Sequence, residues 1–494
     1  MSRVLIGQSY YLRFDPKLWA AMQPYPPLGA LYAAADLRRR GHEVALFDAM
    51  LEDSEERWAE ALARHRPDVA VLFEDNFNYL SKMCLLRMRE AAFRMISMAQ
   101  ALGCTVVVCG SDATDNVERY LGQGADYVVL GEGEVSLAAL LEQLAGTSGT
   151  FDQVTGISFR NAAGELVNTG RRENLKDLDA LAFPAWDLVD IERYRRAWAR
   201  HGRFSMNMST TRGCPFHCNW CAKPIWGQRY AVRSPGNVVA ELEWLRAAFG
   251  PGHISFVDDI FGLKPGWTRS FADLVRQRGA VTPFKCLSRA DLLLRDGEVE
   301  ALRDAGCETV WMGAESGSQK VLDAMDKGTH VEQIVEAAER LRAVRIRVGF
   351  FLQFGYPGEA REDIEATRRL VRECQPDDIG ISVSYPLPGT KFYDRVRTGL
   401  GDRRNWVASD DLAMLYQGPF STRYYRRLHG VVHKEFRLRQ AAGTVSPAIH
   451  LGRAVRRIGS RDRLARARDA LTLPLDQLVL DGIQRLDRRR AGAH

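Results

Sequence analysis

The chain has 494 residues, of which 46% are hydrophobic and 26% are charged, and its formal net charge is +6. This length predicts two or three domains, each large enough to hold a substantial core. No apolar run approaches the ~18–20 residues that a membrane-spanning helix needs, and the first residues lack the pattern of a signal peptide. The composition therefore argues against an integral membrane protein, and nine cysteines without a secretion signal predict reduced thiols in the cytoplasm.

Residues 1–145 alternate strand-like and helix-like segments. The short apolar, strand-like runs are residues 3–10, 43–48, 69–73, 105–110 and 126–131. Amphipathic segments such as 26–40 and 87–102 separate them. This alternation predicts an α/β domain, a doubly wound parallel sheet covered by helices, and the ligands of such sheets bind at the carboxyl ends of the strands.

Residues 146–204 lose this alternation, and we interpret them as a linker that contains a β-hairpin turning at 161–165. The strand-like runs that follow are residues 205–213, 253–259, 284–289, 309–316, 347–355 and 378–386. Six β-α units over residues 205–400 predict an open or partial barrel of the TIM type. Residues 401–494 show no further strand pattern and are expected to be helical.

The excess positive charge lies in the C-terminal tail. From Leu451 onward the chain has eleven arginines, no lysine and five aspartates, which accounts for the whole net charge. A tail of this kind is either a solvated helical end, the commoner case, or a contact with anionic lipid or nucleic acid. Because residues 1–450 are balanced in charge, nucleic acid is not expected as a partner, whereas peripheral contact with a membrane stays open.

Three of the nine cysteines crowd into the segment TTRGCPFHCNWCAKP. Cys214, Cys218 and Cys221 follow the first strand of the predicted barrel, where a short loop can aim three thiolates at one point. A structural zinc ion needs four protein ligands, but no second Cys-x2-Cys pair exists, and His217 would need a strained loop to reach the same ion. A [4Fe–4S] cluster with three thiolate ligands and one iron open to an exogenous ligand explains the shortage better.

The spacing Cys-x3-Cys-x2-Cys, with the aromatic Trp220 before the last cysteine, resembles the signature of radical S-adenosylmethionine (SAM) enzymes. In that family the amine and carboxylate of SAM bind the open iron, and one electron from the cluster splits SAM into methionine and a 5′-deoxyadenosyl radical. The resemblance covers residues 205–395 and implies a SAM site at the barrel mouth. It also implies a one-electron reductant, such as flavodoxin or ferredoxin, as a partner. The alternative is a zinc or purely structural site.

Two further segments of the barrel fit this resemblance. FVDDIF stands where many members carry Gly-Gly-Glu, so Asp258 or Asp259 is expected to hold the SAM amine, although a role within the loop is equally open. LSRADL places Ser288 and Arg289 at the end of the third strand. A hydroxyl there suits the ribose of SAM, and a guanidinium suits its carboxylate.

The later strands carry similar marks. GAESGS places Glu315 at the end of the fourth strand, within reach of the ribose or of Arg289, with which it would otherwise form an ordinary ion pair. FLQFGYPGE, which includes Gln353, resembles the fifth-strand motif near the adenine, and YPLPGT resembles a sixth-strand segment of the family.

The first domain has no G-x-G-x-x-G after its first strand, so a dinucleotide site is not expected. Instead PYPPLGALYAAADLRRRGHEVALFDA, CGSDAT and GADYVVLGEGEVSL resemble the cobalamin-binding domains that precede some radical SAM barrels. The residues that the resemblance assigns to cobalamin are Gln8, Ser9, Tyr10, Asn76, Gly110, Ser111, Gly131 and Glu132. None of the ten histidines follows an aspartate by two positions, so a lower histidine ligand to cobalt is not expected. The alternative is a domain that has lost its cofactor.

The resemblance implies a cobalamin-dependent radical SAM enzyme that methylates an unactivated carbon. The deoxyadenosyl radical would remove a hydrogen atom, methylcobalamin would supply the methyl group, and a second SAM would restore it. A second interpretation keeps the cofactors without methyl transfer and predicts an oxidative cyclisation or a rearrangement of a tetrapyrrole or other natural product. It follows from a resemblance to the anaerobic magnesium-protoporphyrin monomethyl ester cyclase group, which closes a ring oxidatively. A third, a non-enzymatic cobalamin sensor or carrier, leaves the three cysteines unexplained. The substrate, a small molecule or a lipid-like compound, does not follow from the sequence.

Overall fold

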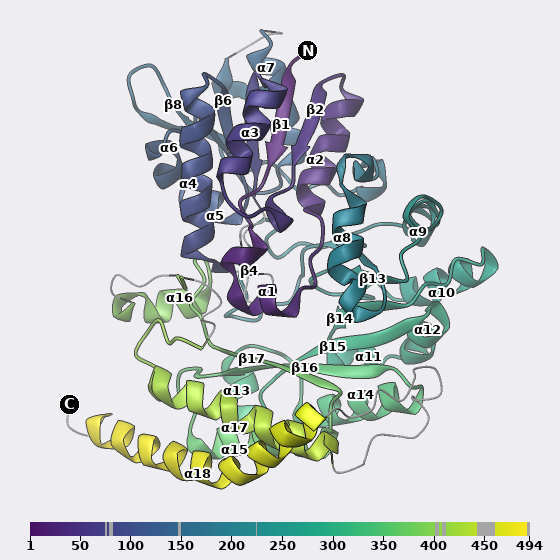
Figure 1. Ribbon diagram of the computed structural model, residues 1–494, viewed down its shortest axis with the longest axis vertical. Helices are drawn as coiled ribbons and strands as arrows, with labels where there is room; N and C mark the ends of the chain where they lie inside the picture. Colours follow the sequence, from purple (N-terminus) through teal and green to yellow (C-terminus); the bar gives the residue numbers. More distant parts are fainter. Residues whose placement is uncertain are drawn as a thin grey trace.

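The structure is a computed structural model that describes residues 1–74, 77–78, 83–146, 150–223, 225–400, 405–407, 412–441 and 460–491. An N-terminal α/β domain lies above a second α/β domain, and two C-terminal helices cross the far side of the second domain (Figure 1). Within the described ranges, no helix combines the length and the apolar character needed to cross a membrane.

The N-terminal domain is built on a seven-stranded sheet in the order β2-β1-β3-β6-β7-β8-β9. Its strands are β1 (Arg3–Gly7), β2 (Glu43–Phe47), β3 (Val69–Phe73), β6 (Thr105–Cys109), β7 (Tyr127–Val129), β8 (Ile157–Arg160) and β9 (Leu166–Asn168). The first five are parallel, as the sequence predicts. The expected hairpin forms as β8 and β9, but β8 pairs antiparallel with β7, so the hairpin extends this sheet instead of lying in a separate linker.

Helices cover both faces of this sheet (Figure 1). They are α2 (Leu28–Arg39), α3 (Glu56–His65), α4 (Leu86–Ala101), α5 (Ser111–Asp115), α6 (Val117–Gly122) and α7 (Glu134–Leu144). The short α1 (Pro16–Ala21) lies instead at the end of the domain that faces the second domain (Figure 1). Because the side chains of a strand alternate between faces, Leu5 packs in one buried cluster while Val4 and Ile6 pack in another. Both faces are therefore buried, which explains the unbroken apolar runs of the sequence. The short β4 (Phe77–Asn78) and β5 (Met83–Cys84) form a separate antiparallel pair.

The second domain holds a six-stranded parallel sheet in which the spatial order of the strands follows the chain order. Its strands are β10 (Ser205–Met208), β13 (His253–Phe256), β14 (Phe284–Ser288), β15 (Cys307–Glu315), β16 (Arg347–Phe354) and β17 (Asp378–Val383). Each strand joins the next through a helical crossover, which confirms the predicted partial barrel. A small antiparallel pair, β11 (Thr211–Arg212) and β12 (Ala231–Val232), follows β10.

Helices precede this sheet, connect its strands and follow its last strand. They are α8 (Ile191–Trp198), α9 (Pro235–Phe249), α10 (Trp267–Gln277), α11 (Ala290–Leu293), α12 (Glu298–Ala305), α13 (Gln319–Ala324), α14 (Val331–Ala343), α15 (Arg361–Cys374) and α16 (Lys391–Val396). At the start of α9 the side chain of Ser234 accepts a hydrogen bond from the N–H of Asn237, and Pro235 takes the first turn. Gly250, with a φ of 57°, ends the helix.

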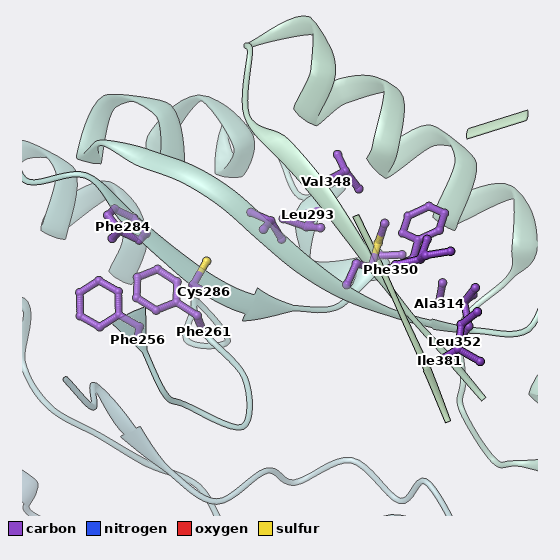
Figure 2. Close-up of a cluster of buried hydrophobic side chains, with 14 of the residues drawn as sticks. Phe256, Phe261, Phe284, Cys286, Leu293, Ala314, Val348, Phe350, Leu352 and Ile381 are labelled. Carbon is purple, nitrogen blue, oxygen red and sulfur yellow. The ribbon is translucent and has the colours of Figure 1, made fainter. Parts of the chain in front are cut away.

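Alternation along the barrel strands separates a packed layer from the inner wall. The buried side chains between strands and helices include Phe256, Phe284, Cys286, Phe350, Leu352 and Ile381 (Figure 2). The intervening positions, among them Trp311, Phe351 and Gln353, project to the opposite face. Trp311 and Phe351 stack there with ring centroids 4.7 Å apart. The inner wall thus mixes aromatic and polar side chains, as a binding surface requires.

The C-terminal region is helical, as predicted. α17 (Thr422–Ala441) and α18 (Ser460–Ala491) run antiparallel along the outer side of the barrel (Figure 1). Arg437 pairs with Asp469 at 2.8 Å and Arg427 pairs with Asp476 at 2.7 Å. These ion pairs fix the register of the two helices.

The two domains touch at several places. After the barrel, residues 405–407 return to the first domain, where the N–H of Leu86 donates to the carbonyl of Trp406 at 2.9 Å. The side-chain amide of Asn207 on β10 donates to the carbonyl of Pro26 at 3.0 Å. These hydrogen bonds tie the second domain and the segment after it to the first domain.

Candidate functional site

The three predicted cluster ligands lie on the loop that follows β11. Cys214, Cys218 and Cys221 are free thiols and half-buried, whereas the six other cysteines are free and buried. Gly213 precedes the loop with a φ of 78°, and a Cβ there would lie 2.3 Å from the carbonyl oxygen of Arg229, so only glycine fits. Within the described residues, no three His, Cys, Asp or Glu side chains gather closely enough to hold a metal ion. Convergence of the three thiols therefore stays a prediction.

The guanidinium of Arg289 lies against this loop. It stacks on Phe216 at 3.6 Å from the ring centroid, and its Nη1 lies 3.8 Å from Sγ of Cys218. Its Nη2 donates to the carbonyl of Lys327 and its Nε donates to Asp291, both at 2.9 Å. The guanidinium thus places a positive charge beside the sulfur of Cys218. Arg289 therefore suits a cluster site as well as the carboxylate of SAM.

Glu315, which was expected to reach the ribose or Arg289, forms an ion pair with Lys327, and its contact with the ribose stays a prediction. Its Oε1 accepts a hydrogen bond from Nζ of Lys327 at 2.8 Å, and both side chains are buried. The pairing of β15 with β16 shifts register between Gly313 and Glu315, and Glu315 has a left-handed φ of 56°. Such a bulge re-aims a side chain. Lys327 is a site residue that no sequence motif had indicated.

The two aspartates after β13 have different surroundings. Asp258 is buried and accepts hydrogen bonds from the N–H groups of Thr210 and Thr211, at 2.7 and 2.8 Å, and from the Thr210 hydroxyl at 2.6 Å. Burial raises the pKa of Asp258 to about 6, against the effect of these donors. Asp259 is half-buried, and its charge adds to the rise that burial causes in the pKa of Cys214. Asp258 thus fastens the loop, and Asp259 lies near the cysteines.

Several buried polar atoms at the barrel mouth have no hydrogen-bond partner among the described residues. They are both amide atoms of Gln353, the hydroxyl of Ser384 and the indole N–H of Trp220. Gln353 lies near the end of β16, Ser384 follows β17, and the ring of Trp220 lies 6.2 Å from that of Tyr385. Ser288, the last residue of β14, is also nearly buried. Unpaired buried polar atoms are costly, so these positions fit a polar ligand such as SAM.

The residues assigned to cobalamin gather at the carboxyl edge of the N-terminal sheet, except Asn76, which lies outside the described residues. Gln8, Ser9 and Tyr10 follow β1, Gly110 and Ser111 follow β6, and Gly131 and Glu132 lie just after β7. Ser9 donates to Glu74 through its N–H at 3.0 Å and its hydroxyl at 2.7 Å. A Cβ on Gly110 would lie 2.8 Å from the carbonyl oxygen of Glu74. The backbone at Glu74 therefore requires glycine at position 110, whether or not cobalamin binds. Contact between this edge and cobalamin stays a prediction.

Glu132 has a protein partner that the sequence did not reveal. Arg212, on β11, donates to Glu132 and also to Glu134, the latter at 2.6 Å. All three side chains are at most 10% exposed. The other carboxylate oxygen of Glu132 accepts from the N–H of Leu175 at 2.6 Å. We call Arg212, Glu132 and Glu134 the Arg212 clamp, because it fastens the start of the cysteine loop to the first domain.

A cavity of about 220 Å³ lies beside the Arg212 clamp. Glu132 lines it from the first domain, Leu175 from the connecting segment, and Trp226 and Tyr230 from the second domain. Its walls combine aromatic rings with charged groups, and this mixture suits the binding of part of a large polar ligand.

Family models match both halves of this arrangement. The Radical SAM superfamily matches residues 208–371, and the B12 binding domain matches residues 20–141. Together they define a class of enzyme in which a cobalamin domain precedes a radical SAM barrel.

Curated relatives span most of the chain. Hopanoid C-3 methylase of Methylococcus capsulatus is 30% identical over 375 residues, which are 74% of this chain and 68% of the relative. An uncharacterized methyltransferase of Pyrococcus horikoshii is 26% identical over 376 residues, 75% of this chain and 78% of the relative. Anaerobic magnesium-protoporphyrin IX monomethyl ester cyclase of Cereibacter sphaeroides is 27% identical over 383 residues, 76% of this chain and 60% of the relative. The chain belongs to the cobalamin-dependent radical SAM enzymes.

A solved structure shares the complete architecture. The cobalamin-dependent SAM radical enzyme OxsB, solved with aqua-cobalamin and SAM, aligns with a TM-score of 0.71 over 98% of this chain and 75% of its own, at 16% identity. The fold is therefore that of the family from the first sheet to the C-terminal helices. The cofactors of the family are a [4Fe–4S] cluster, SAM and cobalamin. Its members are enzymes that need a reductant. Membership in the family therefore argues against the interpretation as a non-enzymatic cobalamin sensor or carrier.

Proposed function

We propose that the protein methylates an unactivated carbon of a small substrate. When bound, the cluster and SAM supply a hydrogen-abstracting radical, and cobalamin supplies the methyl group. Relatives named as a methylase and a methyltransferase support this reaction. The observation that carries the proposal is the Arg212 clamp, because it ties the cysteine loop to the sheet edge assigned to cobalamin.

The residues of the barrel take the following roles in this proposal. Cys214, Cys218 and Cys221 hold the cluster, and Nη1 of Arg289 lies 3.8 Å from Sγ of Cys218. Asp259 holds the amine of SAM, because Asp258 is already engaged by the threonine donors of the loop.

Other polar groups orient SAM. Gln353, whose buried amide has no partner among the residues that the structure describes, hydrogen-bonds the adenine, and Trp220 donates its indole N–H to the same ligand. The ribose is assigned to Ser288, the last residue of β14. Glu315 neutralises Lys327, so that this buried cation stays in place beside Arg289.

The first domain, residues 1–145, holds cobalamin at its carboxyl edge. Gln8, whose Nε2 is buried and has no partner among the described residues, is the polar group best placed to meet the cofactor. Glu132 acts through Arg212 and not by direct contact, because both of its carboxylate oxygens are engaged.

The reaction is tested with anaerobically reconstituted protein, methylcobalamin, a one-electron reductant and SAM that carries a deuterated methyl group. An extract of the producing cells supplies the substrate. Mass spectrometry should find a product with the labelled methyl group, together with 5′-deoxyadenosine and S-adenosylhomocysteine. Formation of 5′-deoxyadenosine without any labelled product would count against methylation.

The cluster is tested separately. Cys218→Ala should lose the broad iron–sulfur absorbance and all SAM cleavage, because the two remaining thiolates are too few to bind the cluster. Cys104→Ala, which changes a buried thiol beside β6, is the matched control and should keep both. Full absorbance in the Cys218 variant would contradict the assignment.

An oxidative cyclisation without methyl transfer is the second candidate, and the similarity to the cyclase of Cereibacter sphaeroides favours it. It predicts 5′-deoxyadenosine without S-adenosylhomocysteine and a product that lacks the labelled methyl group. The same incubation distinguishes the two reactions.

We further propose that flavodoxin or ferredoxin is the reductant and that the substrate is a lipid-like or other small molecule of the cytoplasm. Nine free cysteines suit a reducing compartment. We also propose that the basic C-terminal segment makes peripheral contact with a membrane.

A further inference from the structure

One side of α18 exposes a stripe of leucines. They are Leu464, Leu471, Leu475, Leu478 and Leu486, between 54% and 80% exposed. At 3.6 residues per turn these positions fall within a sector of about 80° and span roughly 33 Å of helix. On the opposite side, Leu480 and Ile483 are only 5% exposed and pack on the protein. The helix is therefore apolar on two sides, of which the protein covers one.

The charges of α18 are sorted between these two sides. The acidic side chains described on it, at positions 469, 476, 481 and 487, all bind the body of the protein. Their partners are Arg437 at 2.8 Å, Arg427 at 2.7 Å, Arg361 at 3.0 Å and the N–H of Ser421 at 2.9 Å. Arg468 and Arg485 flank the leucine stripe and have no carboxylate partner among the described residues. Among the side chains that the structure describes, the outer side therefore carries leucines and arginines and no acidic group.

We propose that this side of α18 docks the protein on an anionic lipid surface. Leucines would enter the acyl boundary while the arginines bind phosphate groups, which is the arrangement of interfacial amphipathic helices. A second copy of the chain fits less well. A helix pair needs apolar residues throughout its seam, and here Arg468, Gly482 and Arg485 occupy seam positions.

The position of α18 makes this docking possible without blocking the site. The helix lies on the far side of the barrel from the N-terminal domain (Figure 1). The junction that holds the Arg212 clamp therefore stays clear of the bilayer. The anionic lipid surface is a partner that methylation itself does not require. It specifies the peripheral membrane contact that is part of the proposed function.

The test uses the full-length protein with sedimenting vesicles of phosphatidylcholine, alone or mixed with phosphatidylglycerol. The protein should bind the mixed vesicles and be released by salt, because exposed charges are screened. Combined Leu471→Gln, Leu475→Gln and Leu478→Gln should lower the partition coefficient at least tenfold. Leu102→Gln, which changes a leucine that is 57% exposed on the first domain, should bind as the wild type does. Circular dichroism checks that the triple variant keeps its helices.

A second variant separates charge from apolar contact. Arg468→Gln with Arg485→Gln should reduce the preference for phosphatidylglycerol about tenfold or more, because each arginine near an anionic surface contributes about 1 kcal/mol. Failure of the wild type to bind mixed vesicles, or equal binding by the triple leucine variant, would overturn the proposal. A wild-type dimer that the triple variant converts to a monomer would assign the stripe to a second copy instead. Vesicle binding needs no cofactor, so these outcomes are independent of the methylation test.

Discussion

Nη2 of Arg212 lies 2.6 Å from Oε1 of Glu134, and the two side chains are 10% and 4% exposed. This ion pair crosses from the second domain to the first, two positions before Cys214. Because a buried charge is tolerated only when it is paired, neither residue can leave the junction without cost. The cobalamin domain and the cysteine loop are thereby positioned as one unit.

Removal of the clamp cation should therefore destabilise the whole protein. Arg212→Gln leaves Glu132 and Glu134 buried without a cation, and the free energy of unfolding should fall by ~3–5 kcal/mol. Thermal unfolding measures this loss, and the iron content after reconstitution should fall with it. Arg38→Gln is the control, because its partner Asp187 is 58% exposed and such surface pairs contribute ~0–1 kcal/mol. Equal melting temperatures for the two variants would contradict a structural clamp.

Asp258 and Asp259 should separate into a structural and a binding residue. Asp259→Asn should weaken SAM binding by about 10–100-fold with little change in melting temperature, because it removes one charge-assisted hydrogen bond. Asp258→Asn should instead lower the melting temperature, since it disturbs the hydrogen bonds from Thr210 and Thr211. Anaerobic equilibrium dialysis with SAM and thermal unfolding measure the two effects. The reverse pattern would exchange the assignments.

Gln353 should matter for ligand binding and not for folding. Both of its amide atoms are buried and have no partner among the described residues, so Gln353→Met removes an unsatisfied polar group. The melting temperature of the free protein should be unchanged or higher, while the dissociation constant for SAM rises about tenfold. Loss of stability without loss of affinity would place the amide in the core and not in the site.

The stability of the protein should fall as the pH rises toward 8. Burial raises the pKa of Glu359 to about 8, against hydrogen bonds from the N–H of Gly355 and the hydroxyl of Tyr425. Between the ordinary value of 4.5 and this pKa, the folded protein retains a proton that the unfolded chain releases. The contribution of protonated Glu359 to the free energy of unfolding is fully present below pH 4.5. It decreases by about 1.4 kcal/mol for each pH unit up to the pKa of Glu359 in the folded protein.

Glu359→Gln removes this titration, because the amide is neutral at every pH. The melting temperature of the variant should exceed that of the wild type at pH 8, and the difference should shrink toward pH 5. Glu192→Gln changes a carboxylate that is 64% exposed and should follow the wild-type curve. Parallel curves for the wild type and Glu359→Gln would show that Glu359 titrates normally.

Local patterns were sufficient for the architecture. The strands of both sheets were predicted because apolar runs and amphipathic helices have different periods, and a parallel sheet covered on both faces requires their alternation. The hairpin was also visible, but its attachment to β7 was not, because hydrogen bonds between distant strands leave no mark in either strand alone.

The sequence predicts the three cysteines as cluster ligands because the prediction rests on their spacing within eight residues. Such local spacing is visible in a single sequence. The partners of Arg212, Glu315 and Asp258 were decided only by the tertiary structure. Arg212 meets Glu132 across 80 positions, and Glu315 turns to Lys327 at a bulge. Ion pairs and hydrogen bonds depend on distances of a few ångströms in space, and only the folded chain sets those distances.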